Sequence, residues 1–282
     1  MRIAYLGPAG TFTEDALREA LAADLEFEPL RVPTIREAIL AVERGEADRA
    51  LVPVENSIEG SVRSTLDTLA FEAGGVTIVG EHDFAVRAML IARGRLELGR
   101  IERVLSHPQP LAQCARFLGE NLPDANQESR DSTAAAVKEI SEAAAPWAAI
   151  GARSAAALYG CEILREGIED EANNVTRFLW IAPAGIPAEV GKVWKTSLVF
   201  SELGADHPGA LVEALQEFST RGVNLTRIES RPLRSELGRY MFFCDLEGGV
   251  AERPVAESIE ALRGKAESVR VLGSYPVGEP PA

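Results

Sequence analysis

The sequence has few of the residues that bind metals or form disulfides. Its 282 residues include three cysteines and three histidines. Cys114, Cys161 and Cys244 lie far apart and form no C-x-x-C pair, a pattern that indicates buried, unreactive thiols. The histidines are equally scattered, and none has the spacing of zinc ligands. These scarcities argue against a zinc site, a redox-active disulfide and a histidine-based catalytic triad.

Long apolar runs and positive charge are also scarce. No run approaches the roughly 20 apolar residues that cross a bilayer, and the chain reaches a Gly-Pro loop at Gly7-Pro8, too early for a signal peptide. We therefore expect a cytoplasmic protein that does not enter membranes. The 29 basic residues are outnumbered by 43 acidic ones, giving a net charge of −14. This balance argues against nucleic-acid partners, and an anionic substrate would need a locally positive pocket.

What is present is a repeated alternation of strand and helix patterns. The length suffices for two domains, and 46% hydrophobic content is ordinary for a globular chain. Alternating strands and helices predict an α/β fold with parallel-rich sheets. Strands near Phe84 and Leu179 are predicted to carry the chain between two lobes, as in bilobal ligand-binding proteins. From Trp194 the pattern changes to βαββαβ, which predicts a ferredoxin-like domain.

Polar side chains gather at the ends of two predicted strands. The stretch 173–178 places amides, a hydroxyl and a guanidinium directly before a buried apolar run, and the stretch 55–62 follows another strand. In an extended chain Asn174 and Thr176 point to one face and Arg177 to the other. Taken alone, the first stretch could equally be a surface turn. Because ligands of open α/β sheets bind at the carboxyl ends of strands, the two stretches together favour a shared cleft.

A third candidate is the loop 7–13, which joins the first strand to a helix starting near Glu14, with Thr13 as the expected N-cap. Such a loop can bind an anion with its helix N-terminus. A tight turn without a ligand explains the same residues.

Six motifs together carry a resemblance to a known family. They are Gly7–Phe12, Pro53–Ser57, Ser106–Cys114, Asn174–Phe178, Gly209–Val212 and Glu229–Pro232. The first four resemble prephenate dehydratase, and the last two resemble the ACT regulatory domain of the same enzyme. Since nothing before Met1 could hold a fused chorismate mutase, we expect the monofunctional form. Many members carry a histidine near position 88, where this chain has Ala88; we take that difference as peripheral.

The resemblance implies a periplasmic-binding-protein-like catalytic domain over residues 1–183 and an ACT domain over 194–282. The first lobe would hold about 1–77 plus 165–183, and the second about 78–164. The implied reaction converts prephenate to phenylpyruvate, carbon dioxide and water, and it needs no cofactor. Arogenate dehydratase is the alternative enzyme, and a non-catalytic bilobal amino-acid sensor is the alternative of another class.

The resemblance also implies roles for single residues. Thr176 is the expected proton donor. The other expected catalytic residues are Asn56, Ser57 and Gln113. The expected substrate-binding residues are Thr11, Asn174, Arg177 and Phe178. Arg177 could instead brace the loop internally, which its position opposite Thr176 favours.

In the second domain the resemblance implies feedback inhibition by L-phenylalanine. The expected effector residues are Gly209, Ala210, Leu211, Val212, Glu229, Ser230, Arg231 and Pro232. A helix cap and an edge turn would explain these motifs without a ligand. The implied assembly is a homodimer or homotetramer joined through the ACT domains.

Overall fold

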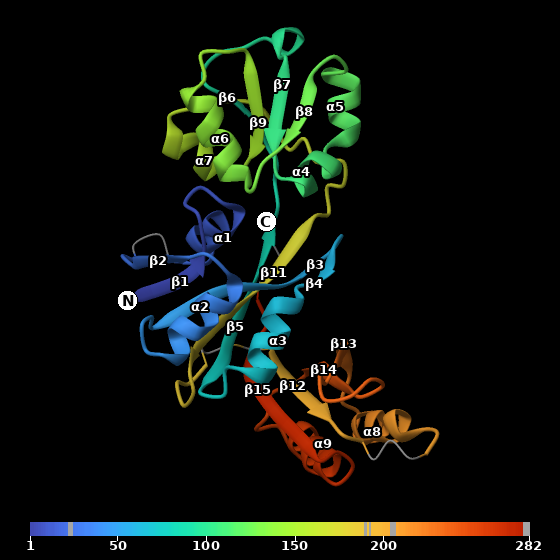
Figure 1. Ribbon diagram of the computed structural model, residues 1–282. Helices are drawn as coiled ribbons and strands as arrows, with labels where there is room; N and C mark the ends of the chain where they lie inside the picture. Colours follow the sequence, from blue (N-terminus) through green and yellow to red (C-terminus); the bar gives the residue numbers. More distant parts are fainter. Residues whose placement is uncertain (22–24, 189–190, 192, 204–206, 279–282) are drawn as a thin grey trace.

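The computed structural model describes residues 1–21, 25–188, 191, 193–203 and 207–278. Its strands form a ten-stranded sheet and a five-stranded sheet. Figure 1 shows the smaller sheet at one end of an elongated molecule, with the larger sheet running to the other end. Among the described residues, no helix has both the length and the apolar character needed to cross a membrane.

The first lobe is built on one half of the larger sheet. Its strands are β1 (Arg2–Leu6), β2 (Glu28–Val32), β3 (Arg49–Asn56), β4 (Gly60–Ser61), β5 (Val76–Ala85) and β11 (Val175–Pro183). Strands β1, β2 and β3 are parallel, and β11 runs antiparallel between β3 and β5. Helices α1 (Phe12–Ala20), α2 (Ile35–Glu43) and α3 (Arg63–Phe71) cover the strands.

The two faces of this half-sheet have separate cores. On one face Tyr5, Leu17, Phe178 and Trp180 pack together. The residues of α2 and α3 pack on the other face with alternate residues of β11, including Leu179. Successive residues of a strand point to opposite faces, so β11 contributes to both cores.

The second lobe is the five-stranded sheet and its helices. The sheet order is β10 (Glu162–Glu166), β6 (Met89–Ala92), β9 (Trp147–Gly151), β7 (Arg103–Ser106) and β8 (Asn126–Ser129). Around it lie the 3-10 helix η1 (Leu98–Arg100) and helices α4 (Pro108–Gln113), α5 (Ala115–Asn121), α6 (Thr133–Glu142) and α7 (Arg153–Tyr159). The chain enters this lobe after β5 and returns before β11, so the two expected crossovers are present (Figure 1).

The start of the second lobe differs from the expected position near residue 78. Strand β5 pairs with β11 from Val76 to Ala85, and the second sheet begins at Met89. The sequence pattern predicts separate strands over 76–79 and 84–91, and the polar residues Glu81, His82 and Asp83 lie between them. In the structure the Glu81 carboxylate is buried against the ammonium group of Lys195, at 2.7 Å, so the strand continues through it.

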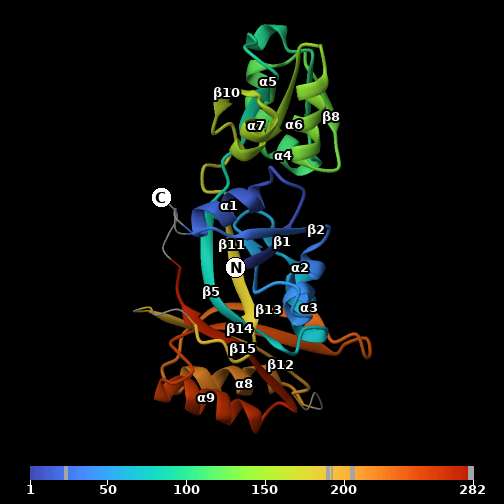
Figure 2. The same ribbon diagram turned by 90° about the vertical axis from the view of Figure 1, so that its left-hand side faces the viewer.

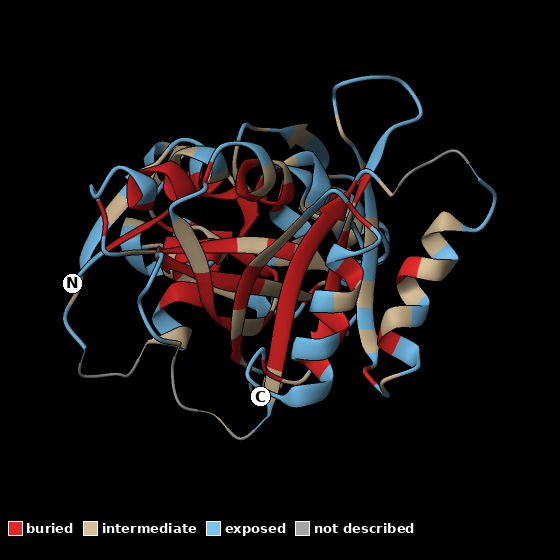
Figure 3. Ribbon diagram, turned by 90° about the horizontal axis from the view of Figure 1, so that it is seen from below, coloured by how far each residue is buried: buried red, intermediate tan, exposed pale blue. Residues whose placement is uncertain are grey.

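The C-terminal domain has the predicted βαββαβ order. Its elements are β12 (Trp194–Ser201), α8 (Ala210–Ser219), β13 (Leu225–Pro232), β14 (Tyr240–Glu247), α9 (Arg253–Arg263) and β15 (Ser268–Pro276). Figure 2 shows α8 and α9 on one side of these strands and the first lobe on the other. Val199, Met241 and Phe243 share a core with α2 and α3, and the buried residues concentrate on the central strands (Figure 3). The C-terminal sheet is therefore covered on both faces.

The two halves of the larger sheet meet at one close contact. Gly273 of β15 pairs with Ile78 of β5. A Cβ atom on Gly273 would lie 2.2 Å from the carbonyl oxygen of Ile78 and 2.7 Å from its Cβ. Only glycine allows the strands to approach this closely, because the atoms crowding the site belong to backbone and to a buried side chain.

We predict that Gly273→Ala destabilises the protein by about 1–3 kcal/mol, since the added methyl group forces the two strands apart. Denaturant unfolding measures this difference. Gly119→Ala is the control, because its new Cβ meets no atom within 4 Å in helix α5, and it should be neutral or stabilising by up to about 1 kcal/mol. Equal stability of the Gly273→Ala variant and the unmodified protein would contradict the close contact.

Candidate functional site

The side-chain amide of Asn56 lies at the centre of the polar cluster at the end of β3. Its oxygen accepts the backbone N–H groups of Ile58 (3.0 Å) and Glu59 (2.9 Å). These two bonds fix the amide orientation, so its nitrogen faces β11. There the nitrogen donates to the side-chain oxygens of Asn174 at 2.8 Å and Thr176 at 2.9 Å. The turn after β3 thereby sets the position of the two side chains from the opposite strand.

Thr176 is half-buried and lies opposite both Asn56 and Phe84 in the sheet register. Its hydroxyl oxygen accepts the hydrogen bond from Asn56. A hydroxyl has one proton and can accept as well as donate. Among the described residues, no hydrogen bond uses the Thr176 proton, so the hydroxyl can give it to a bound molecule.

Further hydrogen bonds extend this cluster, and those of Gln113 connect it to the second lobe. The buried Asn174 donates to the side-chain oxygen of Gln113 at 3.2 Å, and Gln113 donates to the carboxylate of Glu59 at 3.3 Å. Gln113 is the last residue of α4 in the second lobe, whereas Glu59 lies in the turn after β3. Ser57 donates to the carbonyl of Asn173 at 2.7 Å and accepts the N–H of Val175 at 3.0 Å. Asn56, Ser57, Gln113, Asn174 and Thr176 are thus brought together as one connected group.

Thr11 begins α1, in place of the expected Thr13, which is buried within the helix. The Thr11 hydroxyl is buried, makes no capping bond and has no hydrogen-bond partner in the part of the chain that the structure describes. An unpaired buried hydroxyl is costly, which suits a group that binds a ligand. The carboxylate of Glu14 already accepts the N–H of Gly10 at 3.0 Å. The expected anion site at this helix start is therefore partly filled by the chain's own carboxylate.

Gly10 brings the first loop against the second lobe. It has a φ of +78°, and a Cβ atom there would lie 3.0 Å from the Cα of Ala155 in α7. A side chain would be strained by this backbone conformation and crowded by the neighbouring helix. Glycine at this position lets the loop that ends at Thr11 reach the boundary between the lobes.

Arg177 and Phe178, two of the expected substrate-binding residues, make close contacts within the protein. The Arg177 guanidinium, with a side chain 14% exposed, contacts the carboxylates of Glu55 (2.8 Å) and Asp245 (2.9 Å). These contacts lie on the face of β11 opposite Thr176, and they fit the bracing interpretation. Phe178 is on the Thr176 face but is only 2% exposed, because it packs in the core at 6.5 Å from the ring of Phe84.

The environment of Arg177 keeps it charged. Burial acts to lower the pKa of the guanidinium, but the neighbouring negative groups, Asp245 first among them, raise it above its usual value. The carboxylate of Glu81, 3.7 Å from the guanidinium, also raises the pKa of Arg177. A buried cation among carboxylates is stable only while each keeps its partners. A substrate carboxylate could pair with Arg177 only if these ion pairs were broken.

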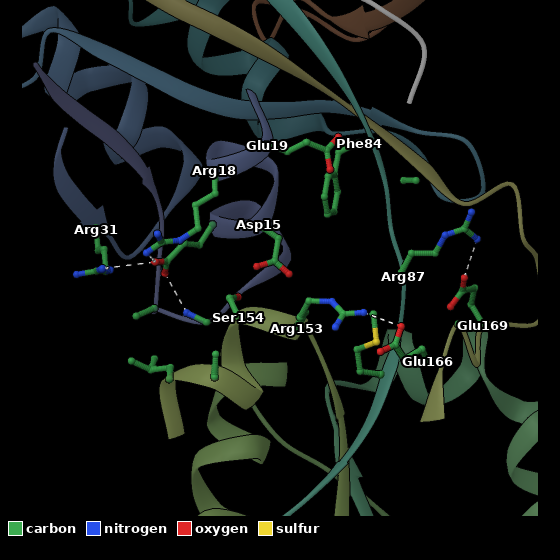
Figure 4. Close-up of a pocket in the computed structure, with 18 of the residues that line it drawn as sticks. Asp15, Arg18, Glu19, Arg31, Phe84, Arg87, Arg153, Ser154, Glu166 and Glu169 are labelled. Atoms are coloured by element: carbon green, nitrogen blue, oxygen red, sulfur yellow. Dashed lines mark hydrogen bonds and ion pairs between the residues drawn. The ribbon is translucent and has the colours of Figure 1, made fainter. Parts of the chain in front are cut away.

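A cavity of about 1050 Å³ lies between α1 and α7, beside the crossovers (Figure 4). Phe84, which lies opposite Thr176 on the neighbouring strand β5, lines this cavity. Thr176, Asn56 and Gln113 do not line it. Four arginines and five acids are on its walls, namely Arg18, Arg31, Arg87, Arg153, Glu14, Asp15, Glu19, Glu166 and Glu169. Arg87 pairs with Glu169, and Arg153 pairs with Glu166. Burial raises the pKa of the Asp15 carboxyl in this wall.

The expected effector residues divide between two surfaces. Gly209 starts α8 with a φ of 102°, its Cβ position meets no described residue within 4 Å, and Val212 is 58% exposed. Ala210 and Leu211 are half-buried in the same first turn. On β13, Ser230 and Pro232 are exposed, whereas Glu229 and Arg231 point to the first lobe.

These inward side chains make specific contacts with the first lobe. Glu229 accepts a short hydrogen bond from the Ser61 hydroxyl. Arg231 donates to both carboxylate oxygens of Asp67 in α3, at 3.0 and 2.8 Å. Glu229 and Arg231 therefore join the ACT domain to the first lobe, and their expected role in an effector pocket stays a prediction.

Comparison with known proteins identifies the two parts of the chain. The family model described as prephenate dehydratase matches residues 3–185, and the model of the ACT domain matches residues 200–264. The prephenate dehydratase of Amycolatopsis methanolica is 42% identical over 276 residues, which cover 97% of this chain and 88% of that protein. The chain belongs to the prephenate dehydratase family.

Two solved structures have a similar fold, and one of them is a prephenate dehydratase. The prephenate dehydratase of Arthrobacter aurescens in complex with L-Phe is 40% identical and has a TM-score of 0.88, over 98% of this chain and 90% of that one. GqqA, described as a novel type of quorum quenching acylase, is 31% identical with a TM-score of 0.86, over 99% and 98% of the two chains.

Several residues that contact the site were not among the site residues expected from the sequence. Glu59 completes the Gln113 contact, and Glu55 and Asp245 hold Arg177. Glu55 and Glu59 lie in a polar stretch that the sequence had already marked, so their position was a usable signal. Asp245 gave no such signal, because it lies in an apolar strand more than sixty residues further along the chain.

We predict that the thiols of Cys114 and Cys244 do not react in the folded protein. Burial raises the pKa of each to about 12, so little thiolate forms near neutral pH. Cys161 is half-buried and should react first with a chromogenic thiol reagent. Unfolding should expose the remaining thiols, and a Cys161→Ser variant should lose the early phase. Equal rapid labelling of all the cysteines would contradict the burial.

Proposed function

We propose that this chain converts prephenate to phenylpyruvate, carbon dioxide and water. The observation that carries the proposal is the Thr176 hydroxyl, which accepts a hydrogen bond from a fixed Asn56 amide and keeps its own proton unused. It lies on the strand that leaves the crossover between the lobes. Membership of the prephenate dehydratase family supports the same reaction.

The chemistry asks little beyond positioning and one proton. The bond from the ring to its carboxylate breaks, and carbon dioxide leaves. The freed electron pair makes the ring aromatic as the hydroxyl on the opposite ring carbon departs, and a proton from Thr176 turns that hydroxyl into water. Solvent then returns a proton to Thr176. Asn56 holds the donor in place, and Asn174 and Gln113 keep the adjoining amides fixed. Positioned proton transfer of this kind contributes about 10²–10⁴-fold.

We predict that Thr176→Ala lowers the rate of phenylpyruvate formation by about 10²–10⁴-fold, because the proton donor is lost. Substrate binding should change little, since Asn56, Ser57 and Gln113 remain. Thr176→Ser should keep part of the rate because it keeps the hydroxyl. Steady-state kinetics on prephenate measures both effects. Turnover near normal in the alanine variant would remove Thr176 from this role.

The same assay with arogenate separates the two substrates. Arogenate has an amino group in place of the keto oxygen of prephenate. The proposal requires a higher kcat/KM for prephenate, and preference for arogenate would overturn it.

For the ACT domain we propose feedback inhibition by L-phenylalanine at the exposed start of α8 and the outer face of β13. The first N–H groups of a helix can donate hydrogen bonds to a carboxylate, and Gly209 has no side chain that would block it. Ile228 and Val212 are large apolar side chains that are 47% and 58% exposed. Strand β13 is an edge of the described sheet, so a second copy can pair with it and cover these side chains. The Arthrobacter aurescens relative was solved in complex with L-Phe, which supports L-phenylalanine as the effector.

We predict that Ile228→Asp weakens both self-association and inhibition, because a charge on the outer face of β13 opposes burial against a second copy. Analytical ultracentrifugation and prephenate kinetics with added L-phenylalanine measure the two effects. Val250→Asp is the control, because Val250 is 41% exposed but lies in the loop after β14. If both variants behave alike, β13 is not the joining surface.

A further inference from the structure

A charge cluster lies directly behind the Thr176 and Asn56 pair, with an arginine and an aspartate that are largely buried and a glutamate whose side chain is 39% exposed. It consists of Glu55, Arg177 and Asp245, and we call it the junction cluster. Arg177 contacts Glu55 at 2.8 Å and Asp245 at 2.9 Å. The side chains of Arg177 and Asp245 are 14% and 8% exposed. Charges this deeply buried hold their geometry tightly, because losing one partner leaves another uncompensated.

The junction cluster adjoins the reacting group through covalent neighbours. In the β3–β11 register Thr176 lies opposite Asn56, and Arg177 lies opposite Glu55. Each residue of the charged pair is therefore next in sequence to a residue of the polar pair, on the reverse face of the strands. A shift of Arg177 relative to Glu55 moves the backbone that positions the 2.9 Å bond between Asn56 and Thr176.

On its other side the junction cluster is held by strands of the ACT domain. Asp245 of β14 accepts the Ser197 hydroxyl of β12 at 2.6 Å, and Ser197 is 2.7 Å from the hydroxyl of Tyr275 in β15. Arg227 of β13 lies 3.7 Å from Glu55 and donates to Ser61 at 2.9 Å. All four strands of the ACT sheet thus contribute a side chain to the cluster or to its support.

Strand β13 connects the cluster to the proposed effector surface. Its residues alternate, with Arg227 facing the first lobe and Ile228 facing outward. A ligand or second copy that moves the outer face of β13 moves Arg227 with it. The charged contact with Glu55 then changes together with the effector surface.

We propose that the junction cluster is a positioning element that couples the ACT domain to the Thr176 and Asn56 pair. The inference rests on the proposed function and names the residues through which its regulation acts. Arg177 holds β11 against β3 behind the reacting group, and Asp245 sets where Arg177 lies. Occupation of the effector surface changes this contact and so changes substrate binding and turnover. Linkage requires that the effector and the substrate alter each other's affinity by the same factor.

The test is Asp245→Asn, which keeps the side-chain size and the hydrogen bond from Ser197 but removes the negative charge that pairs with Arg177. We expect L-phenylalanine to bind within about threefold of its normal affinity by calorimetry, while the factor by which it raises the apparent KM for prephenate falls about tenfold. Ser197→Ala removes the support of Asp245 without removing a charge, so it should give a smaller loss in the same direction. Ser197→Ala also tests the inference if the Asp245→Asn variant does not fold.

Thr77→Val is the matched control. Thr77 donates to the carbonyl of Leu272 at 3.2 Å, so it also joins the first lobe to the ACT domain but contacts no member of the junction cluster. Coupling should stay normal in this variant. Normal coupling in both Asp245→Asn and Ser197→Ala would overturn the inference, as would an equal loss in Thr77→Val. If the unmodified protein neither turns over prephenate nor binds L-phenylalanine, the proposed function itself fails, and the inference fails with it.

Discussion

The structure depends on one strand whose two faces serve different neighbours. Strand β11 lies between β3 and β5, and alternation sends Thr176 to one face and Arg177 to the other. The first face carries the hydroxyl that is held by the Asn56 amide. The second carries a cation that is buried among carboxylates from two domains. Because both side chains leave the same short piece of backbone, neither environment can change without affecting the other.

The polar cluster shows how a small number of amides can orient a weak acid. Two backbone N–H groups donate to the side-chain oxygen of Asn56 and fix the orientation of the amide. Its nitrogen therefore faces Asn174 and Thr176. Gln113 then ties this group to the second lobe. Such preorganised dipoles stabilise a reacting group without having to reorient during the reaction. The arrangement suits a reaction in which aromatisation of the product supplies the driving force.

The ACT sheet lies directly against the first lobe. Its helices cover one face, and the first lobe covers the other. Glu229 and Arg231, which a motif alone assigns to an effector pocket, hold the first lobe through Ser61 and Asp67. The outward residues of the same strand remain open. A strand that presents one face to each partner is a direct mechanical link between them.

Much of this architecture was predictable from local patterns. Strand and helix periodicity, the two crossovers and the βαββαβ order follow from side-chain spacing, and alternation alone placed Thr176 and Arg177 on opposite faces. The motifs identified the family, because they are short, continuous stretches. Strand β5 was divided in error at the polar residues that include Glu81, and only the distant Lys195 makes that carboxylate compatible with a buried strand.

The sequence by itself therefore indicated most of the strands, which residues are polar at their ends, and which family the chain resembles. The tertiary structure decided which of those residues meet: Asn56 with Thr176, Glu55 and Asp245 with Arg177, and Gly273 with Ile78. The physical reason is that hydrogen bonds and ion pairs depend on distance in space, whereas a sequence pattern reports only which way each side chain points from its own backbone.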